Sequence, residues 1–474
     1  MPPQQPSSPS SLNDKRAPLA VIVMAAGLGT RMKSDISKVL HPVCGRPILS
    51  YVIDAALRLE PERLVVVTGP DDDAVEALLP AGVERAVQPE RRGSGDAVRA
   101  GMEPLADIRG DVLVLSGDVP LAGAEVYAGL LERMRECGAR AAISTVVLTD
   151  PAHYGRVLRD DEGAVVRIVE ARDATPGELD VAEINVGFYV FSADDLRRFL
   201  PQLRPQNAQG EYYITDLVRS VIDGGGRVAA VVADDPAICM GINTRVELAE
   251  ANSTMRRRLV DDLMLSGVTV EDPQTTYVDH GVIVGRDTTI RPQTTLAGLT
   301  AVGERCTIGP GSLLRDVVVG DETSIVSSHL LECSVGDGCS VGPFAYIRPG
   351  TELAEGAKAG TFVEIKASRV GRGSKVPHLS YVGDAVIGEN CNIAAGNITA
   401  KYDGERKHTT VIGDNVKTGS DTVLVAPVAL GDDAWTAAGS VITRDIPEGA
   451  LGVARARQKN IESYGERRRG ASDS

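Results

Sequence analysis

Residues 21–32 read VIVMAAGLGTRM, an apolar run that breaks into a loop with two glycines and then an arginine. The loop follows what reads as a buried strand, and ligands of α/β proteins bind at such strand ends. It matches neither common phosphate-binding motif. A P-loop has four residues between its glycines, whereas Leu28 alone separates Gly27 from Gly29, and Met32 stands where a dinucleotide fingerprint has Gly or Ala. The stretch therefore predicts a ligand loop in an α/β domain and implies neither of those cofactors.

Composition narrows the classes of protein to which the chain can belong. Its 474 residues exceed one typical domain several times, so we expect at least two cores. A net charge of −15 argues against a nucleic-acid partner, which needs a basic face. Seven cysteines without a C-x-x-C pair disfavour disulfides and zinc knuckles and fit a reducing cytoplasm. The Pro/Ser/Gln-rich start predicts a disordered leader, and no apolar run is long enough to predict a membrane span.

The N-terminal half alternates short apolar runs with helical patterns. The runs that read as buried strands are 20–25, 64–68, 112–116, 141–148 and 186–191. Residues 48–59 and 72–79 have the apolar spacing of helices. This rhythm predicts an α/β domain with a mostly parallel sheet. The loop at Gly27 and the tripeptide Ser116-Gly117-Asp118 both follow predicted strands and are therefore candidate ligand positions.

The C-terminal half has a different period. Aliphatic residues recur at a spacing of six in three runs, over 284–314, 335–353 and 412–442. Glycine often follows the aliphatic residue, as in Val302-Gly303 and Ile412-Gly413, where a tight corner needs a residue without a Cβ atom. A period of six fits neither a helix nor an alternating strand and predicts a parallel β-helix. The alternative is a β-sandwich with accidental spacing.

Breaks in these patterns suggest the domain boundaries. The six-residue register slips near Gly320, Gly371 and Thr399, and the last slip carries the polar insert KYDGERKHTT. Residues 244–265 have the pattern of a connecting helix. We therefore expect a leader over 1–17, an N-terminal domain over 18–243, a linker helix over 244–266, a β-helix over 267–461 and a flexible tail over 462–474.

Two sets of motifs carry a family resemblance. MAAGLGTRMKSDISKVLHPVCGRP (24–47) resembles the signature of sugar-nucleotide pyrophosphorylases. A hexapeptide β-helix with HLSYVGDA (378–385) and KYDG (401–404) is similar to that of bifunctional members, which join an N-acetylglucosamine-1-phosphate uridylyltransferase to a glucosamine-1-phosphate acetyltransferase. The resemblance implies a Rossmann-like nucleotidyltransferase domain, a left-handed β-helix, a cytoplasmic homotrimer and synthesis of UDP-N-acetylglucosamine for peptidoglycan and lipopolysaccharide.

The first set points to uridylyl transfer from UTP to N-acetylglucosamine-1-phosphate. Ala25, Ala26, Gly27 and Gly29 have little side chain to obstruct a nucleotide, and Arg31 and Lys38 would neutralise its phosphates. By resemblance Asp118 and Asn243 bind Mg²⁺. The residues that by resemblance contact the uridine are Gln88, Gly93 and Ser94, and those that hold the amino sugar are Gly155, Glu170 and Asn185.

The second set points to acetyl transfer from acetyl-CoA to glucosamine-1-phosphate. An amine acceptor needs a neutral base near pH 7, and His378 matches the family's general base, with Glu364 to orient it. The resemblance assigns Arg348 and Lys366 to the sugar phosphate and Tyr381 and Asn392 to the sugar. It assigns acetyl-CoA to Ala395, Lys401, Tyr402, Ser420, Ala438 and Arg455.

Three positions depart from the family pattern, and at one of them Ala394 stands where glycine is common. Arg91 replaces a glutamine, and because arginine only donates hydrogen bonds we expect looser selection of uracil. Lys401 replaces an asparagine, and without a compensating carboxylate its charge is expected to weaken binding of the cationic acceptor, or else to reach the phosphates of CoA. One alternative is a uridylyltransferase whose β-helix is a trimerisation scaffold. A pyrophosphorylase for another sugar is disfavoured, because such relatives lack the HLSY and KYDG elements.

Overall fold

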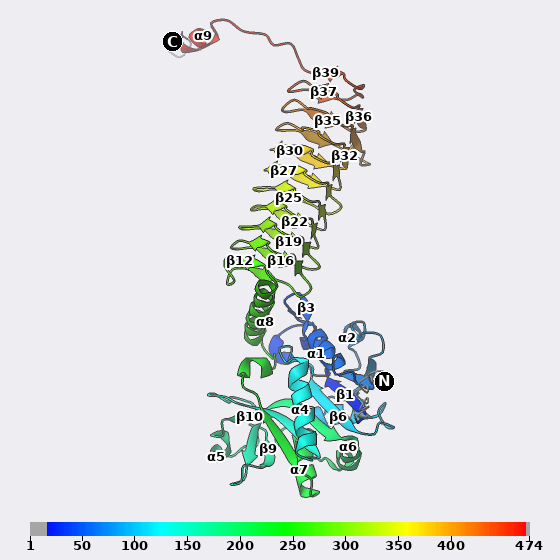
Figure 1. Cartoon of the computed structure of the whole chain (residues 1–474), viewed down its shortest axis with the longest axis vertical. Coiled ribbons are helices and arrows are strands. Elements are labelled where there is room, and N and C mark those ends of the chain that lie inside the picture. Colours follow the sequence, from blue (N-terminus) through cyan, green and yellow to red (C-terminus); the bar gives the residue numbers. More distant parts are fainter. Residues whose placement is uncertain (1–16, 471–474) are drawn as a thin grey trace, which may run out of the picture. The chain divides into compact units, whose positions relative to one another are not determined.

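The computed structural model describes residues 17–470 and divides into two compact units between Met255 and Arg256, inside helix α8 (Arg245–Leu265). Figure 1 shows a sheet with flanking helices in the first unit and a stack of short strands in the second. Apart from Ala17, the predicted leader lies outside the described residues. Within the range predicted to be a flexible tail, Tyr464–Gly470 forms helix α9, and 471–474 lie outside the description.

The first unit is built on one mixed sheet. Its main path runs in the order β11-β7-β10-β6-β1-β4-β5, and all neighbours are parallel except those of β10. The strands are β1 (Leu19–Met24), β4 (Arg63–Thr68), β5 (Glu84–Val87), β6 (Asp111–Ser116), β7 (Ala141–Val147), β10 (Glu183–Ser192) and β11 (Val228–Val232), with β8 (Arg156–Arg159) and β9 (Val165–Val169) at one side. A small hairpin pairs β2 (Pro42–Val43) with β3 (Arg46–Pro47). The predicted α/β fold is confirmed.

Both faces of this sheet are covered, which explains the continuous apolar runs. Along β1, Val21 and Val23 pack into one core, and Ala20 and Ile22 pack into the core on the other face. The helices are α1 (Ile48–Leu57), α2 (Asp73–Glu76), α3 (Ser94–Met102), α4 (Ala124–Glu136), α5 (Pro176–Leu179), α6 (Ala193–Phe199) and α7 (Thr215–Asp223), with short 3-10 turns at Thr30–Met32, Lys38–Leu40, Leu200–Gln202 and Pro236–Cys239. The helix predicted over 72–79 is shorter because Pro80 disfavours a helical residue before it.

The second unit is a parallel β-helix with three faces, each a ladder of very short strands. The first face holds β12 (Thr269–Val270), β15 (Thr289–Ile290), β18 (Thr307–Ile308), β21 (Ser324–Ile325), β24 (Ser340–Val341), β27 (Lys358–Thr361) and β30 (Lys375–His378), and further on β37 (Trp435–Thr436) and β39 (Leu451–Gly452). The second face holds β13 (Tyr277–Val278), β16 (Thr295–Ala297), β19 (Leu313–Arg315), β22 (His329–Leu331), β25 (Tyr346–Ile347), β28 (Glu364–Lys366), β31 (Tyr381–Gly383), β33 (Ile398–Ala400), β35 (Val423–Val425) and β38 (Val441–Ile442). The third face holds β14 (Ile283–Val284), β17 (Ala301–Val302), β20 (Val318–Val319), β23 (Ser334–Val335), β26 (Glu352–Leu353), β29 (Arg369–Val370), β32 (Ala385–Ile387), β34 (Thr410–Ile412) and β36 (Val428–Leu430).

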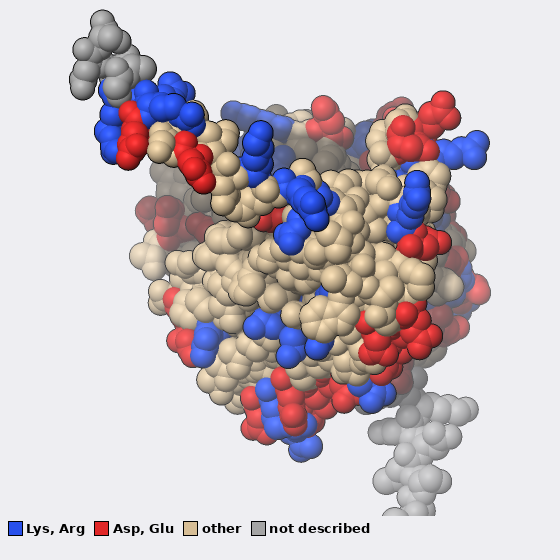
Figure 2. Space-filling model, turned by 90° about the horizontal axis from the view of Figure 1, so that it is seen from above, with Lys and Arg blue, Asp and Glu red and all other residues tan. Residues whose placement is uncertain are grey.

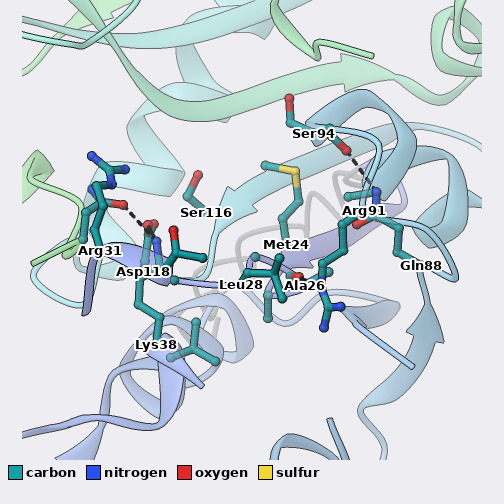
Figure 3. A pocket seen from close by; sticks show the side chains of 18 of the residues that line it. Met24, Ala26, Leu28, Arg31, Lys38, Gln88, Arg91, Ser94, Ser116 and Asp118 are labelled. Atoms are coloured by element: carbon teal, nitrogen blue, oxygen red, sulfur yellow. Dashed lines mark hydrogen bonds and ion pairs between the residues drawn. The ribbon is translucent and has the colours of Figure 1, made fainter. Parts of the chain in front are cut away.

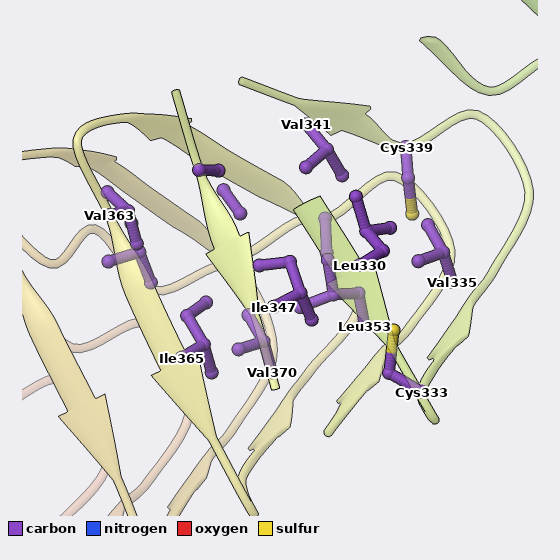
Figure 4. Packing of buried hydrophobic residues seen from close by; sticks show 14 of the residues in the cluster. Leu330, Cys333, Val335, Cys339, Val341, Ile347, Leu353, Val363, Ile365 and Val370 are labelled. Carbon is purple, nitrogen blue, oxygen red and sulfur yellow. The ribbon is translucent and has the colours of Figure 1, made fainter. Parts of the chain in front are cut away.

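The period of six places one aliphatic side chain of each short strand inside the β-helix. Leu330, Ile347 and Ile365 come from successive coils of the second face, are fully buried, and pack on one another in Figure 4. The left-handed β-helix is therefore confirmed, and the β-sandwich alternative is wrong. Ile387 pairs with Ile412, so the coil between them is lengthened, and it carries the polar insert.

The surface mixes charges of both signs. Figure 2 shows basic and acidic side chains side by side on the face drawn there. All seven cysteines lie in the described range, and none of them forms a disulfide bond. None of the helices within residues 17–470 combines the length and the apolar character that crossing a membrane would require.

Candidate functional site

A cavity of about 450 Å³ opens at the carboxyl ends of β1 and β6. Figure 3 shows its side chains, which come from the loop after β1, from the segment after β5 and from the end of β6. The predicted nucleotide and metal residues that line it are Ala25, Ala26, Gly27, Gly29, Arg31, Lys38, Gln88, Gly93, Ser94, Asp118 and Asn243. Ser116, from the tripeptide predicted as a ligand position, lines it as well, and so do Leu28, Thr30 and Glu211, which were not predicted.

The loop after β1 has two glycines with different local requirements. Gly29 has φ of +60°, and a Cβ atom there would lie 2.6 Å from Cβ of Lys38. Gly27 has no heavy atom within 4 Å of such a Cβ. Gly29 is therefore needed for the path of the chain past Lys38, whereas Gly27 leaves open space facing the cavity.

Lys38 joins the two predicted metal ligands. Its Nζ atom donates to Oδ2 of Asp118 at 2.5 Å and to Oδ1 of Asn243 at 3.1 Å, and Figure 3 shows it pointing toward Asp118. Two oxygens from distant parts of the chain thus already converge on one cation.

Local structure explains this convergence. The Gly117 amide donates to the carbonyl of Met24, which ties the end of β6 to the end of β1. Asn243 precedes α8, whose first turn is closed by hydrogen bonds between Thr244 and Glu247 in both directions. The Ile242 amide then donates to the carbonyl of Asp118 and fixes the distance between the two segments.

The segment after β5 supplies a polar wall. Gln88 is 3% exposed, and its amide nitrogen donates to the carbonyl of Gly93 and to the carboxylate of Asp96, both at 3.1 Å. Because both partners accept, the two N–H groups are used and the amide oxygen is left to accept a hydrogen bond. Gly93 has φ of +107°, and a Cβ atom there would lie 2.5 Å from the carbonyl oxygen of Tyr212, so α3 begins against a backbone that admits only glycine.

Arg91 is fixed at the rim of the cavity. Its Nε atom donates to the carbonyl of Ala26 at 2.7 Å, and its Nη2 atom lies 3.6 Å from Oδ2 of Asp72. Arg31 contacts His153 at 3.3 Å across a more exposed part of the site. His153 and Asp72 were not predicted to belong to the site, because their contacts join segments far apart in sequence.

The residues predicted to hold the amino sugar form a separate group. The Asn185 amide donates to the carbonyl of Gly155 at 2.9 Å, and a Cβ atom on Gly155 would lie 3.4 Å from either carboxylate oxygen of Glu170. Burial raises the pKa of Glu170, and the hydrogen bond from Thr215 only partly offsets it. A β-bulge in β10 between Asn185 and Tyr189 places Gly187 against Ser116, which lines the cavity.

In the second unit, the predicted base and four of the six predicted acetyl-CoA residues lie along one corner, whereas Lys401 and Tyr402 lie at the next corner. Thr361 pairs with His378, and the parallel bridges of Lys375 with Asn392, Asn392 with Lys417 and Lys417 with Trp435 continue the ladder. The residues three positions after Lys375, Asn392, Lys417 and Trp435 therefore form a row along this corner: His378, Ala395, Ser420 and Ala438. Arg455 follows this row and donates to the carbonyl of Ala438 at 2.8 Å.

The next corner gathers charged side chains from four successive coils. Arg348 donates to Glu364 at 2.7 Å, Nζ of Lys366 lies 3.6 Å from Oδ2 of Asp384, and Lys401 pairs with the same oxygen. We call Arg348, Glu364, Lys366, Asp384 and Lys401 the corner cluster. Tyr381 lies beside it, with its ring centroid 5.4 Å from Nζ of Lys401.

One prediction about this region stays untested, and another is wrong. Glu364 pairs with Arg348, and within residues 17–470 it makes no hydrogen bond to His378. The expectation that Lys401 lacks a compensating carboxylate is wrong, because Asp384 supplies one. Asp384 stands in the HLSYVGDA motif, and its place one coil from Lys401 is the signal that sequence reasoning missed. Tyr402 is exposed on the insert beside this cluster.

Comparisons with known proteins agree with this geometry. The family described as MobA-like NTP transferase domain matches residues 21–175, which contain the loop, Lys38 and Asp118. A protein of Mycobacterium tuberculosis (strain ATCC 25177 / H37Ra) named "Bifunctional protein GlmU" is 46% identical over 461 residues, covering 96% of this chain and 93% of the relative. Proteins of the same name from Mycolicibacterium gilvum and Mycobacterium marinum are 47% and 45% identical, and each comparison covers 96% of this chain.

Proposed function

Because the chain belongs to the GlmU family, we propose that it carries out both reactions for which the two motif sets are suited. The first is acetyl transfer from acetyl-CoA to glucosamine-1-phosphate. The second is uridylyl transfer from UTP to N-acetylglucosamine-1-phosphate, with release of pyrophosphate. The product is UDP-N-acetylglucosamine. The cysteines, none of which forms a disulfide bond, and the small-molecule substrates support a cytoplasmic location.

The observation that carries uridylyl transfer is the convergence of Lys38, Asp118 and Asn243 in the cavity. A phosphate oxygen of the sugar phosphate attacks the α-phosphorus of UTP, and the bond to pyrophosphate breaks. Lys38 and Arg31 offset the negative charge that gathers on the leaving group. The glycine loop lets the nucleotide approach the backbone, and Gln88 offers its amide oxygen to the N3–H group of uracil.

The residues present fit a Mg²⁺ ion. The carboxylate of Asp118 and the amide oxygen of Asn243 are hard oxygen ligands, and both lie within hydrogen-bond distance of one ammonium. Within residues 17–470 no group of three His, Cys, Asp or Glu side chains is placed to hold a metal, so phosphates and water would complete the coordination. When bound, the ion supplies charge neutralisation at the phosphates.

For acetyl transfer, His378 stands at the start of the row that continues through Ala395, Ser420 and Ala438. The acceptor amine attacks the thioester carbonyl carbon, the carbon–sulfur bond breaks, and CoA leaves as a thiolate. His378 takes the proton that the amine loses. The corner cluster lies one face further along the coil and holds the sugar phosphate through Arg348 and Lys366.

We also propose that the protein is a homotrimer in which a neighbouring β-helix covers the row that begins at His378. Three apolar side chains at the same corner support this: Phe344, Phe362 and Leu379 are 58%, 59% and 64% exposed. Phe344 and Phe362 stack at 5.4 Å, and all three have positive φ. A measurement of mass in solution for the natural protein and Phe362→Asp tests the assembly, since the charged variant should dissociate.

The most direct test of both activities uses the purified full chain. With glucosamine-1-phosphate and acetyl-CoA, release of free CoA should be observed, and with N-acetylglucosamine-1-phosphate and UTP, release of pyrophosphate that requires Mg²⁺. Pyrophosphate release without CoA release would favour a uridylyltransferase whose β-helix is only a scaffold.

A further inference from the structure

Lys401 stands where the sequence resemblance has a neutral asparagine, so its charge departs from the pattern of the resemblance. It follows β33 and lies at the same corner as Gly383 and Asp384 one coil before, because Tyr381 pairs with Ile398. Its side chain is 10% exposed, although lysine is rarely so covered without a partner. The structure therefore holds this ammonium in a defined place.

Three contacts define that place. Lys401 pairs with the carboxylate of Asp384, lies over the ring of Tyr381, and approaches Gly383. A Cβ atom on Gly383 would lie 2.6 Å from both Nζ of Lys401 and the hydroxyl of Tyr381, so a larger residue there would exclude the lysine. Burial lowers the pKa of Lys401, but the hydrogen bonds to Asp384 and Tyr381 raise it overall, so the group is charged at neutral pH.

The charge balance of the corner cluster depends on this residue. Arg348 is paired with Glu364, and Asp384 is shared by Lys401 and, at the longer distance of 3.6 Å, by Lys366. Among the five residues of the corner cluster, two cations and two carboxylates would cancel without Lys401, and Lys407 lies near enough to act on Lys366 and Asp384. With Lys401, one positive charge is left over among these five residues, and Lys366 lies 3.6 Å from a carboxylate whose closer partner is Lys401.

We propose that Lys401 is a positioning residue of the acceptor site, which occupies Asp384 so that Lys366 and the surplus charge serve the phosphate of glucosamine-1-phosphate. The inference rests on the proposed acetyl transfer. It replaces the expectation that Lys401 weakens acceptor binding, and it assigns the side chain to the acceptor rather than to CoA.

The test compares Lys401→Met with the natural full-length protein in the CoA-release assay. We expect KM for glucosamine-1-phosphate to rise about tenfold, since removal of a charge from a hydrogen-bonded pair costs roughly 1.5 kcal/mol. The kcat value and KM for acetyl-CoA should change less than about twofold. Lys401→Arg keeps the charge and should retain a KM near the natural value, and Lys358→Met removes an exposed lysine from the first face as a matched control.

A second variant separates this role from a general effect on folding. In Asp384→Asn with Lys401→Met, Lys366 is again free of a carboxylate and one positive charge is left over, so KM for glucosamine-1-phosphate should return toward the natural value. Glucosamine without phosphate should be acetylated at the same low rate by the natural protein and by Lys401→Met.

The outcomes are distinguishable. An active natural protein with unchanged KM in Lys401→Met, a change confined to KM for acetyl-CoA, or a double variant no better than the single one would each overturn the inference alone. A natural protein that releases no CoA would overturn the proposed acetyl transfer, and the inference with it.

Discussion

Replacement of Gly29 by alanine tests whether the backbone path of the loop after β1 positions Lys38 for uridylyl transfer. The new Cβ atom would lie 2.6 Å from Cβ of Lys38, whereas carbon atoms normally stay about 3.5–4.0 Å apart. The start of the Lys38 side chain must therefore move by about 1 Å, which for a group that positions reacting atoms costs on the order of 100-fold in rate. We expect kcat/KM for uridylyl transfer to fall by about that factor.

Backbone strain adds a separate loss of stability. An alanine at φ of +60° costs roughly 1–2 kcal/mol, which lowers the melting temperature of a unit of this size by about 2–8 °C. Gly138 has φ of +55° and no heavy atom within 4 Å of a new Cβ, so Gly138→Ala carries the strain without the clash. Gly27→Ala carries neither and should leave the melting temperature unchanged while raising KM for UTP.

The measurements are thermal unfolding, pyrophosphate release and CoA release for the three variants. Gly29→Ala should lose uridylyl transfer and keep acetyl transfer, and Gly138→Ala should lose a similar part of its stability while keeping both activities. If Gly29→Ala retained full uridylyl transfer, or lost no more than Gly138→Ala, the loop would not position Lys38 and the reasoning would fail.

Three further outcomes are expected. Asp118→Ala should abolish Mg²⁺-dependent pyrophosphate release and leave CoA release intact, and a folded variant that lost both would contradict separate sites. Arg91→Gln should improve the UTP-to-CTP ratio of kcat/KM by roughly 2- to 10-fold, the worth of one hydrogen bond, and an unchanged ratio would remove Arg91 from the uracil site. Because burial raises the pKa of Glu170 in the folded state, its stabilising effect is complete below its ordinary pKa and is lost as pH rises through the raised value. Glu170→Gln should therefore lose less stability than the natural protein between pH 4 and pH 8, as followed by melting temperature, and its KM for N-acetylglucosamine-1-phosphate should rise about tenfold; equal pH dependence would refute the assignment.

The repeats and the strand ends were predictable because they depend on local sequence. Inward aliphatic residues such as Ile347 recur regularly along the chain, and the same regular spacing stacks them on successive coils of the β-helix. The loop at Gly29 was likewise readable from small residues after a buried run. Asp118 was paired with Asn243 only through the resemblance, although a strand end already marked it as a candidate, and its contact with Lys38 was not predicted.

Pairings across coils and loops were not predictable in the same way. The carboxylate of Asp384 meets Lys401 because Tyr381 pairs with Ile398 one coil on, and the six-residue period, which slips near Thr399, does not by itself give that register. Arg91 was expected beside the base, but its contacts with Ala26 and Asp72 depend on how three separate segments meet. Charge compensation of this kind needs coordinates.

The length of the row of His378, Ala395, Ser420 and Ala438 is set by the number of coils that it crosses. Neighbouring coils are spaced by about 4.8 Å, so the three steps of the row measure roughly 14 Å whatever number of residues each coil contains. The long coil that carries the insert adds chain outside the ladder and no length along it. If acetyl-CoA binds along this corner as proposed, its length must match a whole number of coils. A carrier with a longer or shorter arm would place the thioester out of reach of His378, and no single substitution in the row would restore the distance.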